Sequence, residues 1–331
     1  MRKEASIEKW KKLYEIATEI KEMKPWEYFW DMDIINLSDE DAYISILGHA
    51  GETYGISVYE EKNGFDKFKI LACQQQLNIS SHMAMYMQDN LTLYLGDREE
   101  LSKKQRDIIK ELGYKYRGKN QWLYFMSFKT NYVPYNFDSN EVDRMTKYLL
   151  KLKNALNLYF KEKPQIDFDQ EYILCYSDKN KKITTKKIDY YDFGFNGIQL
   201  ADNIDLVNDL KKLPKSLGIL EIDILPMFMA INDKAYDRPA NPSICMIVDK
   251  KSGMVLASEM STPETGVFGN FANTIISTLF RYGLPKRINI CNSFSGTLLE
   301  ELCNILNIKL GFEDELPALE EAAESLMRFM G

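Results

Sequence analysis

The sequence predicts two domains of mixed α and β structure, an α+β domain with an antiparallel sheet and helices followed by an α/β domain with a mixed sheet. In the first half, short β-rich runs alternate with turn-forming residues between two long helical patterns. In the last third, a strand and a hairpin are followed by helices and strands in alternation. A short polar segment, residues 161–165, separates the halves, so we predict domains at residues 1–165 and 166–331.

The first half begins with an amphipathic helix, because apolar residues recur at helical spacing from Ile7 onward and Pro25 follows. Short β-rich runs come next, with glycine and asparagine between them, which favours an antiparallel meander. The expected strands are residues 34–37, 43–47, 54–59, 68–73 and 91–95.

A second group of elements completes the first half. Ser102 and Gln105 have capping-box spacing and predict the start of a helix. A strand is expected over residues 121–128. A long helix then covers residues 141–161, with Asp138 and Ser139 as candidate caps.

In the last third, the strand that contains Asp223 is expected at the centre of its sheet. The hairpin of residues 244–249 and 254–260 should pair with it antiparallel, through its first strand. Because helix crossovers enforce parallel pairing, residues 287–291 should pair with it in parallel. The remaining elements are expected at residues 267–281, 297–306 and 316–330 (helices) and 308–312 (strand).

Bulk composition indicates an ordered globular protein. Of the 331 residues, 45% are hydrophobic and 12% aromatic, and disordered chains are poor in such residues. No apolar stretch approaches the length of a membrane span. The N-terminus leads directly into a charged amphipathic helix, so we expect no secretory signal and a cytoplasmic location.

Cysteine and histidine usage excludes several classes of site. The cysteines form no CxxC pair and indicate buried thiols in a reducing compartment; they are Cys73, Cys175, Cys245, Cys291 and Cys303. His49 and His82 are the two histidines, and neither belongs to a hydrolase or zinc motif. The sequence also lacks a P-loop and a dinucleotide-binding glycine motif. We therefore expect no cofactor and no resident metal.

Charge argues against a nucleic-acid partner. The net charge is -7, and from Leu220 onward 15 acidic side chains stand against 9 basic ones, a balance of -6. A surface that binds a duplex needs a basic stripe to displace phosphate counterions. The basic run at residues 179–187 is interpreted as a solvated turn with edge-strand lysines. We expect a protein partner, of unknown identity, and no membrane; the oligomeric state is left open.

An aromatic cluster follows the first helix and is a candidate binding surface. Trp26, Tyr28 and Trp30 surround one acidic residue directly after a proline. They could stack on a base, a sugar or a peptide. The alternative, which we favour, is a hydrophobic corner where the helix docks on the sheet.

Four short sequence segments in the last third can be compared with a known fold: Glu221-Ile222-Asp223, Ile247-Val248-Asp249, residues 282–288 and residues 302–308. These segments resemble the catalytic core of retroviral integrases and transposases, and the order of elements resembles the ribonuclease-H-like fold. The resemblance covers about one third of the chain. The whole chain also resembles uncharacterised bacterial proteins with two domains of unknown function, which implies a bacterial cytoplasmic protein.

The integrase resemblance implies two aspartates and a glutamate that hold paired divalent metals. Asp223 corresponds to the first aspartate. Where the second is expected, Cys291-Asn292 stands instead. For the last acid the candidates are Glu320, Glu321 and Glu324. Since paired hard cations need several anionic oxygens, we interpret the domain as one without its original chemistry.

The sequence therefore favours a non-catalytic interaction or scaffold protein on a degenerate ribonuclease-H-like fold, a pseudoenzyme with no committed catalytic or metal residue. The first alternative is a divergent nuclease or transposase-like enzyme that uses magnesium on Asp223, Asp249 and Glu324. Against the metal-binding role in this alternative, Asp249 is better explained as a turn residue before Lys-Lys-Ser-Gly. A further alternative is a small-ligand or peptide binder that uses Trp26 and its neighbours.

Overall fold

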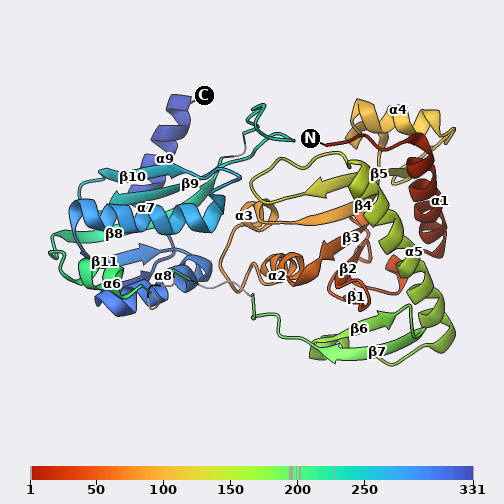
Figure 1. Ribbon diagram of the computed structural model, residues 1–331, viewed down its shortest axis with the longest axis horizontal. Coiled ribbons are helices and arrows are strands. Elements are labelled where there is room, and N and C mark those ends of the chain that lie inside the picture. Colours follow the sequence, from red (N-terminus) through yellow and green to blue (C-terminus); the bar gives the residue numbers. More distant parts are fainter. Residues whose placement is uncertain (1, 194–196, 199, 201–202, 228, 331) are drawn as a thin grey trace. The chain divides into compact units, whose positions relative to one another are not determined.

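The structure is a computed structural model that describes residues 2–193, 197–198, 200, 203–227 and 229–330. It contains two compact units (Figure 1). The first comprises Met1–Ala72, Gln88–Lys129 and Pro134–Gly194, and the second comprises Cys73–Met87, Thr130–Val133 and Phe195–Gly331. Among the described residues, no helix has both the length and the apolar character to cross a bilayer.

The first unit is built on a seven-stranded sheet with the order β5-β4-β3-β2-β1-β6-β7. Its strands are β1 (Ile35–Leu37), β2 (Ala42–Leu47), β3 (Tyr54–Glu60), β4 (Asn90–Gly96), β5 (Trp122–Phe128), β6 (Tyr172–Ser177) and β7 (Lys182–Lys187). All neighbouring strands pair antiparallel except β1 and β6, which pair in parallel. The predicted antiparallel meander is therefore confirmed for β1 to β4, and the separately predicted strand, β5, pairs antiparallel with β4.

Helices cover both faces of this sheet (Figure 1). They are α1 (Ile7–Met23), α2 (Glu61–Ala72), α4 (Lys103–Glu111) and α5 (Ser139–Glu162). The apolar faces of α1 and α5 join the main core with Leu13, Leu149 and Leu152, all without exposed surface. On the opposite face, α2 packs with its own cluster around Phe65 and Phe68. The expected capping box of Ser102 and Gln105 begins α4.

Residues 68–73 were expected to form a strand, and this expectation was wrong. Residues 68–72 belong to α2, in which Phe65 and Phe68 are spaced for one helical face. The Phe65 ring stacks on Tyr43, with centroids 4.0 Å apart. At Gly64 an added Cβ would come within 3.3 Å of the Tyr59 backbone, so the glycine lets the helix lie close to the sheet. The packing of two rings outweighs the β propensity of the run.

The predicted domain boundary at residues 161–165 also differs from the observed division. The strand that follows this segment, β6, pairs in parallel with β1, with Asn36 opposite Cys175. β7 then pairs with β6 at the edge of the sheet, and five of its six residues are exposed, including the lysines Lys182, Lys186 and Lys187. The first unit therefore continues beyond the polar segment to Gly194.

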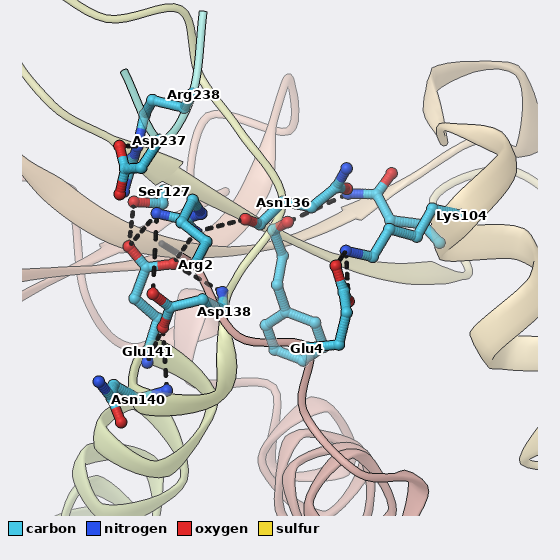
Figure 2. Close-up of polar contacts among 12 residues, drawn as sticks. Arg2, Glu4, Lys104, Ser127, Asn136, Asp138, Asn140, Glu141, Asp237 and Arg238 are labelled. Carbon is cyan, nitrogen blue, oxygen red and sulfur yellow. Dashed lines mark hydrogen bonds and ion pairs between the residues drawn. The ribbon is translucent and has the colours of Figure 1, made fainter. Parts of the chain in front are cut away.

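A buried ionic network ties the N-terminal segment to the start of α5 (Figure 2). The Arg2 guanidinium contacts the Glu141 carboxylate and donates to the Asn136 carbonyl at 2.7 Å. Ser127 of β5 donates to the same carboxylate at 2.7 Å. The backbone N–H of Asp138 donates to it at 2.8 Å, which completes the capping box of α5.

The second unit contains a five-stranded mixed sheet with the order β10-β9-β8-β11-β12. The strands are β8 (Leu217–Pro226), β9 (Ser243–Asp249), β10 (Val255–Met260), β11 (Pro285–Ile290) and β12 (Lys309–Phe312). β8 pairs antiparallel with β9 and parallel with β11, and β11 pairs in parallel with β12. The predicted central place of the Asp223 strand and both of its pairings are confirmed.

The helices of the second unit are α3 (Ser81–Tyr86), α6 (Ile204–Lys211), α7 (Gly266–Tyr282), α8 (Ser293–Leu306) and α9 (Pro317–Met330). α9 packs on the sheet face that carries Met246 and Val248. Cys245 points to the other face and meets Thr274 of α7. Helix α7 connects β10 to β11, and helix α8 connects β11 to β12 (Figure 1).

Candidate functional site

A cavity of about 430 Å³ lies where the parallel strands of the second unit end. Its wall includes Asp223 from the last part of β8, Cys291 and Asn292 just after β11, and Asp314 just after β12. The segment that leads into α3 closes another side with Asn78. In α/β sheets, ligands bind outside the carboxyl ends of parallel strands, and this cavity has that position.

Asp223 is partly buried, and its carboxylate meets three neutral donors. Cys291 Sγ lies 3.4 Å from Oδ2, Asn292 Nδ2 lies 3.2 Å from Oδ1, and Ser295 Oγ lies 3.5 Å from Oδ1. The contacts from Asn292 and Ser295 are at or beyond the long end of ordinary hydrogen bonds, and the thiol contact is a weak bond. No lysine, arginine or histidine among the described residues forms an ion pair with Asp223.

Burial raises the pKa of Asp223, and the N–H of Ile224 and the three side-chain donors offset this only in part. The Cys291 thiol has its pKa raised to about 12, first by burial and then by the Asp223 charge. Cys291 is therefore a neutral thiol near pH 7. A thiolate is the nucleophilic form of cysteine, so this side chain acts as a weak donor and not as a nucleophile.

Asn292 has a structural task at this position. It is the N-cap of α8, where its Oδ1 accepts the Ser295 N–H at 2.7 Å. Its amide nitrogen faces Asp223. Asn78 donates to the Cys291 carbonyl at 2.6 Å and Leu77 accepts from the Ser293 N–H, so the segment before α3 is tied to the same turn.

Asp249 and Glu324, the other acids of the nuclease alternative, do not join Asp223. Asp249 pairs opposite Leu220, three residues from Asp223 on β8, and an odd offset puts the side chains on opposite faces. Its carboxylate accepts from the Ser252 N–H at 2.8 Å and from Ser252 Oγ at 2.7 Å, as a turn aspartate does. Glu324 is exposed and forms an ion pair with Arg328.

The remaining acids near α9 are also engaged elsewhere. Glu320 and Glu321 are exposed, and Glu320 Oε1 accepts from the Leu316 N–H. The core side of the helix carries Leu319. Within the described part of the chain, no three His, Cys, Asp or Glu side chains are grouped to hold a metal ion. The donor set around Asp223 does not fit a pair of divalent metals, because Asn292 and Cys291 offer an amide and a thiol where carboxylates would be needed.

The aromatic cluster of the first unit is divided among different neighbours. Trp26 is half-buried against Tyr54, Tyr28 packs on Phe160, and the Trp30 ring lies on His49 with centroids 3.9 Å apart. Tyr28 and Trp30 remain about half exposed. Trp26 also lines a cavity of about 590 Å³ beside Lys21 and Lys119.

The two histidines take no part in a shared site. His49 Nδ1 lies 2.8 Å from the Trp26 carbonyl in the first unit. His82 is an exposed residue of α3 in the second unit. Neither lines the cavity around Asp223.

Replacing Asp223 with asparagine is expected to raise the stability of the second unit near pH 7. A carboxyl whose folded pKa is raised contributes stability that is fully present below its unfolded pKa and is lost as pH rises through the folded value. The measurement is a series of thermal melts at different pH values. The asparagine variant should have a higher unfolding midpoint than the wild type at pH 7, and the two midpoints should approach each other in acid.

Asp249→Asn is the matched control, and it should behave in the opposite way. Hydrogen bonds from Ser252 lower the pKa of Asp249. The contribution of the Asp249 carboxylate to stability is therefore present above the unfolded pKa and disappears as pH falls. If both variants shifted the midpoint in the same direction at pH 7, the proposed environment of Asp223 would be incorrect.

Two domain families match the chain. Residues 10–176, half of the chain, match the domain of unknown function DUF7309. Residues 206–327 match the domain of unknown function DUF6930 and contain the whole sheet of the second unit and Asp223. No curated protein matches the chain.

Proposed function

This chain belongs to the DUF7309 family, a domain of unknown function, and we propose from the geometry of its second unit that it is a non-catalytic interaction protein with a ligand site at Asp223. In this proposal the second unit is a degenerate ribonuclease-H-like domain. The observation that carries the proposal is the cavity at the carboxyl ends of β8, β11 and β12, with the Asp223 carboxyl in its wall.

The sheet topology supports the ribonuclease-H-like assignment. An antiparallel strand pair precedes two parallel strands, and the first strand, β8, lies at the centre. Asp223 on that strand has the place of the first metal-binding acid in the fold that the sequence resembles. The N-terminus of α8 follows β11 directly, so the residue after this strand faces Asp223.

The side chains around Asp223 support loss of the original chemistry. Asn292 replaces an anionic ligand and is already used as the cap of α8. Asp249 lies on the other face of the sheet, and Glu324 is exposed and paired with Arg328. Two-metal catalysis needs several carboxylates to hold both ions near the reacting phosphate. The acidic balance from Leu220 onward would also repel a phosphate backbone.

We expect the full chain to cleave neither DNA nor RNA with magnesium or manganese. Asp223 and Asp314 are the carboxyl groups that the described residues place in the cavity wall. They are too few to hold two divalent ions, so the occupancy of the second ion should collapse. The measurement is a cleavage assay on single-stranded and double-stranded substrates, with Asp223→Ala in parallel. Metal-dependent cleavage that Asp223→Ala abolishes would replace this proposal with the nuclease alternative.

A further inference from the structure

We propose that the Asp223 cavity binds a primary ammonium group on a short aliphatic chain, from a free amine or from a lysine side chain of a partner protein. The inference rests on the proposed function, because it takes the cavity as a binding site without metal chemistry. It adds the chemical class of the ligand.

The charge of the cavity selects a cation. Among the residues that the structure describes, two with carboxyl groups, Asp223 and Asp314, lie in its wall, and no lysine, arginine or histidine does. A phosphate or carboxylate ligand would therefore meet two like charges and no counter-charge. A bound cation would instead offset the free-energy cost of keeping the partly buried Asp223 carboxylate charged.

The hydrogen bonds around Asp223 leave room for a strong donor. Its contacts with Cys291, Asn292 and Ser295 are 3.2 to 3.5 Å long and come from neutral groups. Bonds between an ammonium and a carboxylate are shorter and about twice as strong as neutral ones. A ligand ammonium would thus supply the charged partner that the described residues do not.

Further acceptors suit the three N–H bonds of an ammonium. The amide nitrogen of Asn78 donates to the Cys291 carbonyl, and Asn78 lines the cavity with an amide group that also carries an acceptor oxygen. Ser80 and Asp314 add oxygen atoms to the wall. A divalent metal would instead need six or more oxygen ligands, several of them anionic.

The apolar part of the wall suits methylene groups. Met83, Leu225 and Phe294 line the same cavity, and polar and apolar wall residues are mixed. A volume of about 430 Å³ is within the range of small-ligand sites. A straight aliphatic chain can lie along these side chains while its ammonium reaches Asp223.

The experiment is calorimetric titration of the full chain with four probes: butylammonium, Nα-acetyl-lysine methylamide, 1-butanol and magnesium chloride. We expect the two ammonium probes to bind and the alcohol, which lacks the charge, to bind at least roughly 10-fold more weakly. The lysine derivative binding more tightly than butylammonium would indicate a protein partner, and the reverse order would indicate a free amine. Either order supports the proposal.

Asp223→Asn should weaken the binding of both ammonium probes by roughly 10- to 100-fold, because it removes the charge and keeps the shape. Asp249→Asn, on the other face of the same sheet, should leave the affinity unchanged. In the wild type, affinity should fall as pH decreases and Asp223 is protonated. The Cys291 thiol faces Asp223 and stays neutral near pH 7. Asp314 shares the cavity, and Glu221, paired with Lys250, lies two residues away on the same face of β8.

The outcomes separate the two proposals. Equal binding of butanol and butylammonium, unchanged affinity in Asp223→Asn, or no ammonium binding below about 10 mM would overturn the ammonium assignment and leave the non-catalytic role in place. Magnesium that competes with butylammonium and supports cleavage would overturn the proposed function itself.

Discussion

Glu221→Ala is expected to destabilise the attachment of α9 by about 2–4 kcal/mol. The Glu221 side chain has no exposed surface and lies on β8. Its Oε2 accepts the N–H groups of Ala318 and Leu319 at 2.9 and 3.0 Å, at the start of α9. Its Oε1 lies 3.2 Å from Lys250 Nζ, as an ion pair and not as an aligned hydrogen bond. Alanine would leave two helix-terminal donors without their acceptor and a lysine without its partner.

Native-state hydrogen exchange is the suitable measurement, because a chain with two units does not unfold in one step and local opening of α9 can be read directly. Glu221→Gln keeps an acceptor oxygen for the helix N–H groups and loses the charge that faces the helix N-terminus and the partly exposed Lys250, so its cost should be near 1 kcal/mol. Glu324→Gln on the exposed side of the same helix should cost less than ~0.5 kcal/mol. Equal losses for the alanine and glutamine variants would contradict the role given to the carboxylate oxygens.

The sequence predicts the second sheet well because each of its elements carries a local signal. Ile244 to Val248 is a continuous apolar run beside a Lys-Lys-Ser-Gly turn, and the parallel pairing of β8 with β11 follows from the helix between them. The strand order could thus be derived from connections alone. The central place of Asp223 was part of that derivation.

Two features of the first unit depend on contacts that no local pattern carries. β6 joins β1 across more than 130 residues, and the polar segment before it looks like a linker only when that pairing is unknown. Phe68 lies in a run with β propensity but forms part of a helix face, because Phe65 and Phe68 pack on the sheet. In both places tertiary packing outweighs the local signal.

The candidate site was predictable only in part, for the same reason. From the sequence, Asp223 and the Cys291-Asn292 turn were singled out as candidates for this site. It could not show that the segment with Asn78, more than 200 residues earlier, is tied to the turn after β11. Ser295 and Asp314 also carried no signal, since a serine in a helix and an aspartate in an acidic loop are ordinary at the surface. Only the folded chain places them in one cavity.

Glu141→Ala is expected to cost about 3–5 kcal/mol in the first unit at pH 7, the cost of leaving a buried charge without its partner. The carboxylate of Glu141 is nearly enclosed, and Arg2, Ser127 and the Asp138 N–H converge on it (Figure 2). The alanine would remove the Glu141 half of the α5 capping box and the anchor of the N-terminal segment together, while the N-cap Asp138 remains. Asp143 lies on the same helix as Glu141 and forms an exposed ion pair with Lys9 of α1, so Asp143→Asn should cost less than ~1 kcal/mol.

The effect of Glu141 should depend on pH, and Glu141→Gln isolates that dependence. Burial alone raises the pKa of Glu141, but the hydrogen bonds from Arg2, the Asp138 N–H and Ser127 together hold it below its usual 4.5. A lowered folded pKa means that the stabilisation is present above pH 4.5 and is lost as pH falls through the folded value. Hydrogen exchange of the first turn of α5 should therefore show wild type and Glu141→Gln well separated at pH 7 and drawing together in acid. A difference that stayed constant down to about pH 3 would mean that the carboxylate charge contributes nothing and that only the shape of the side chain matters.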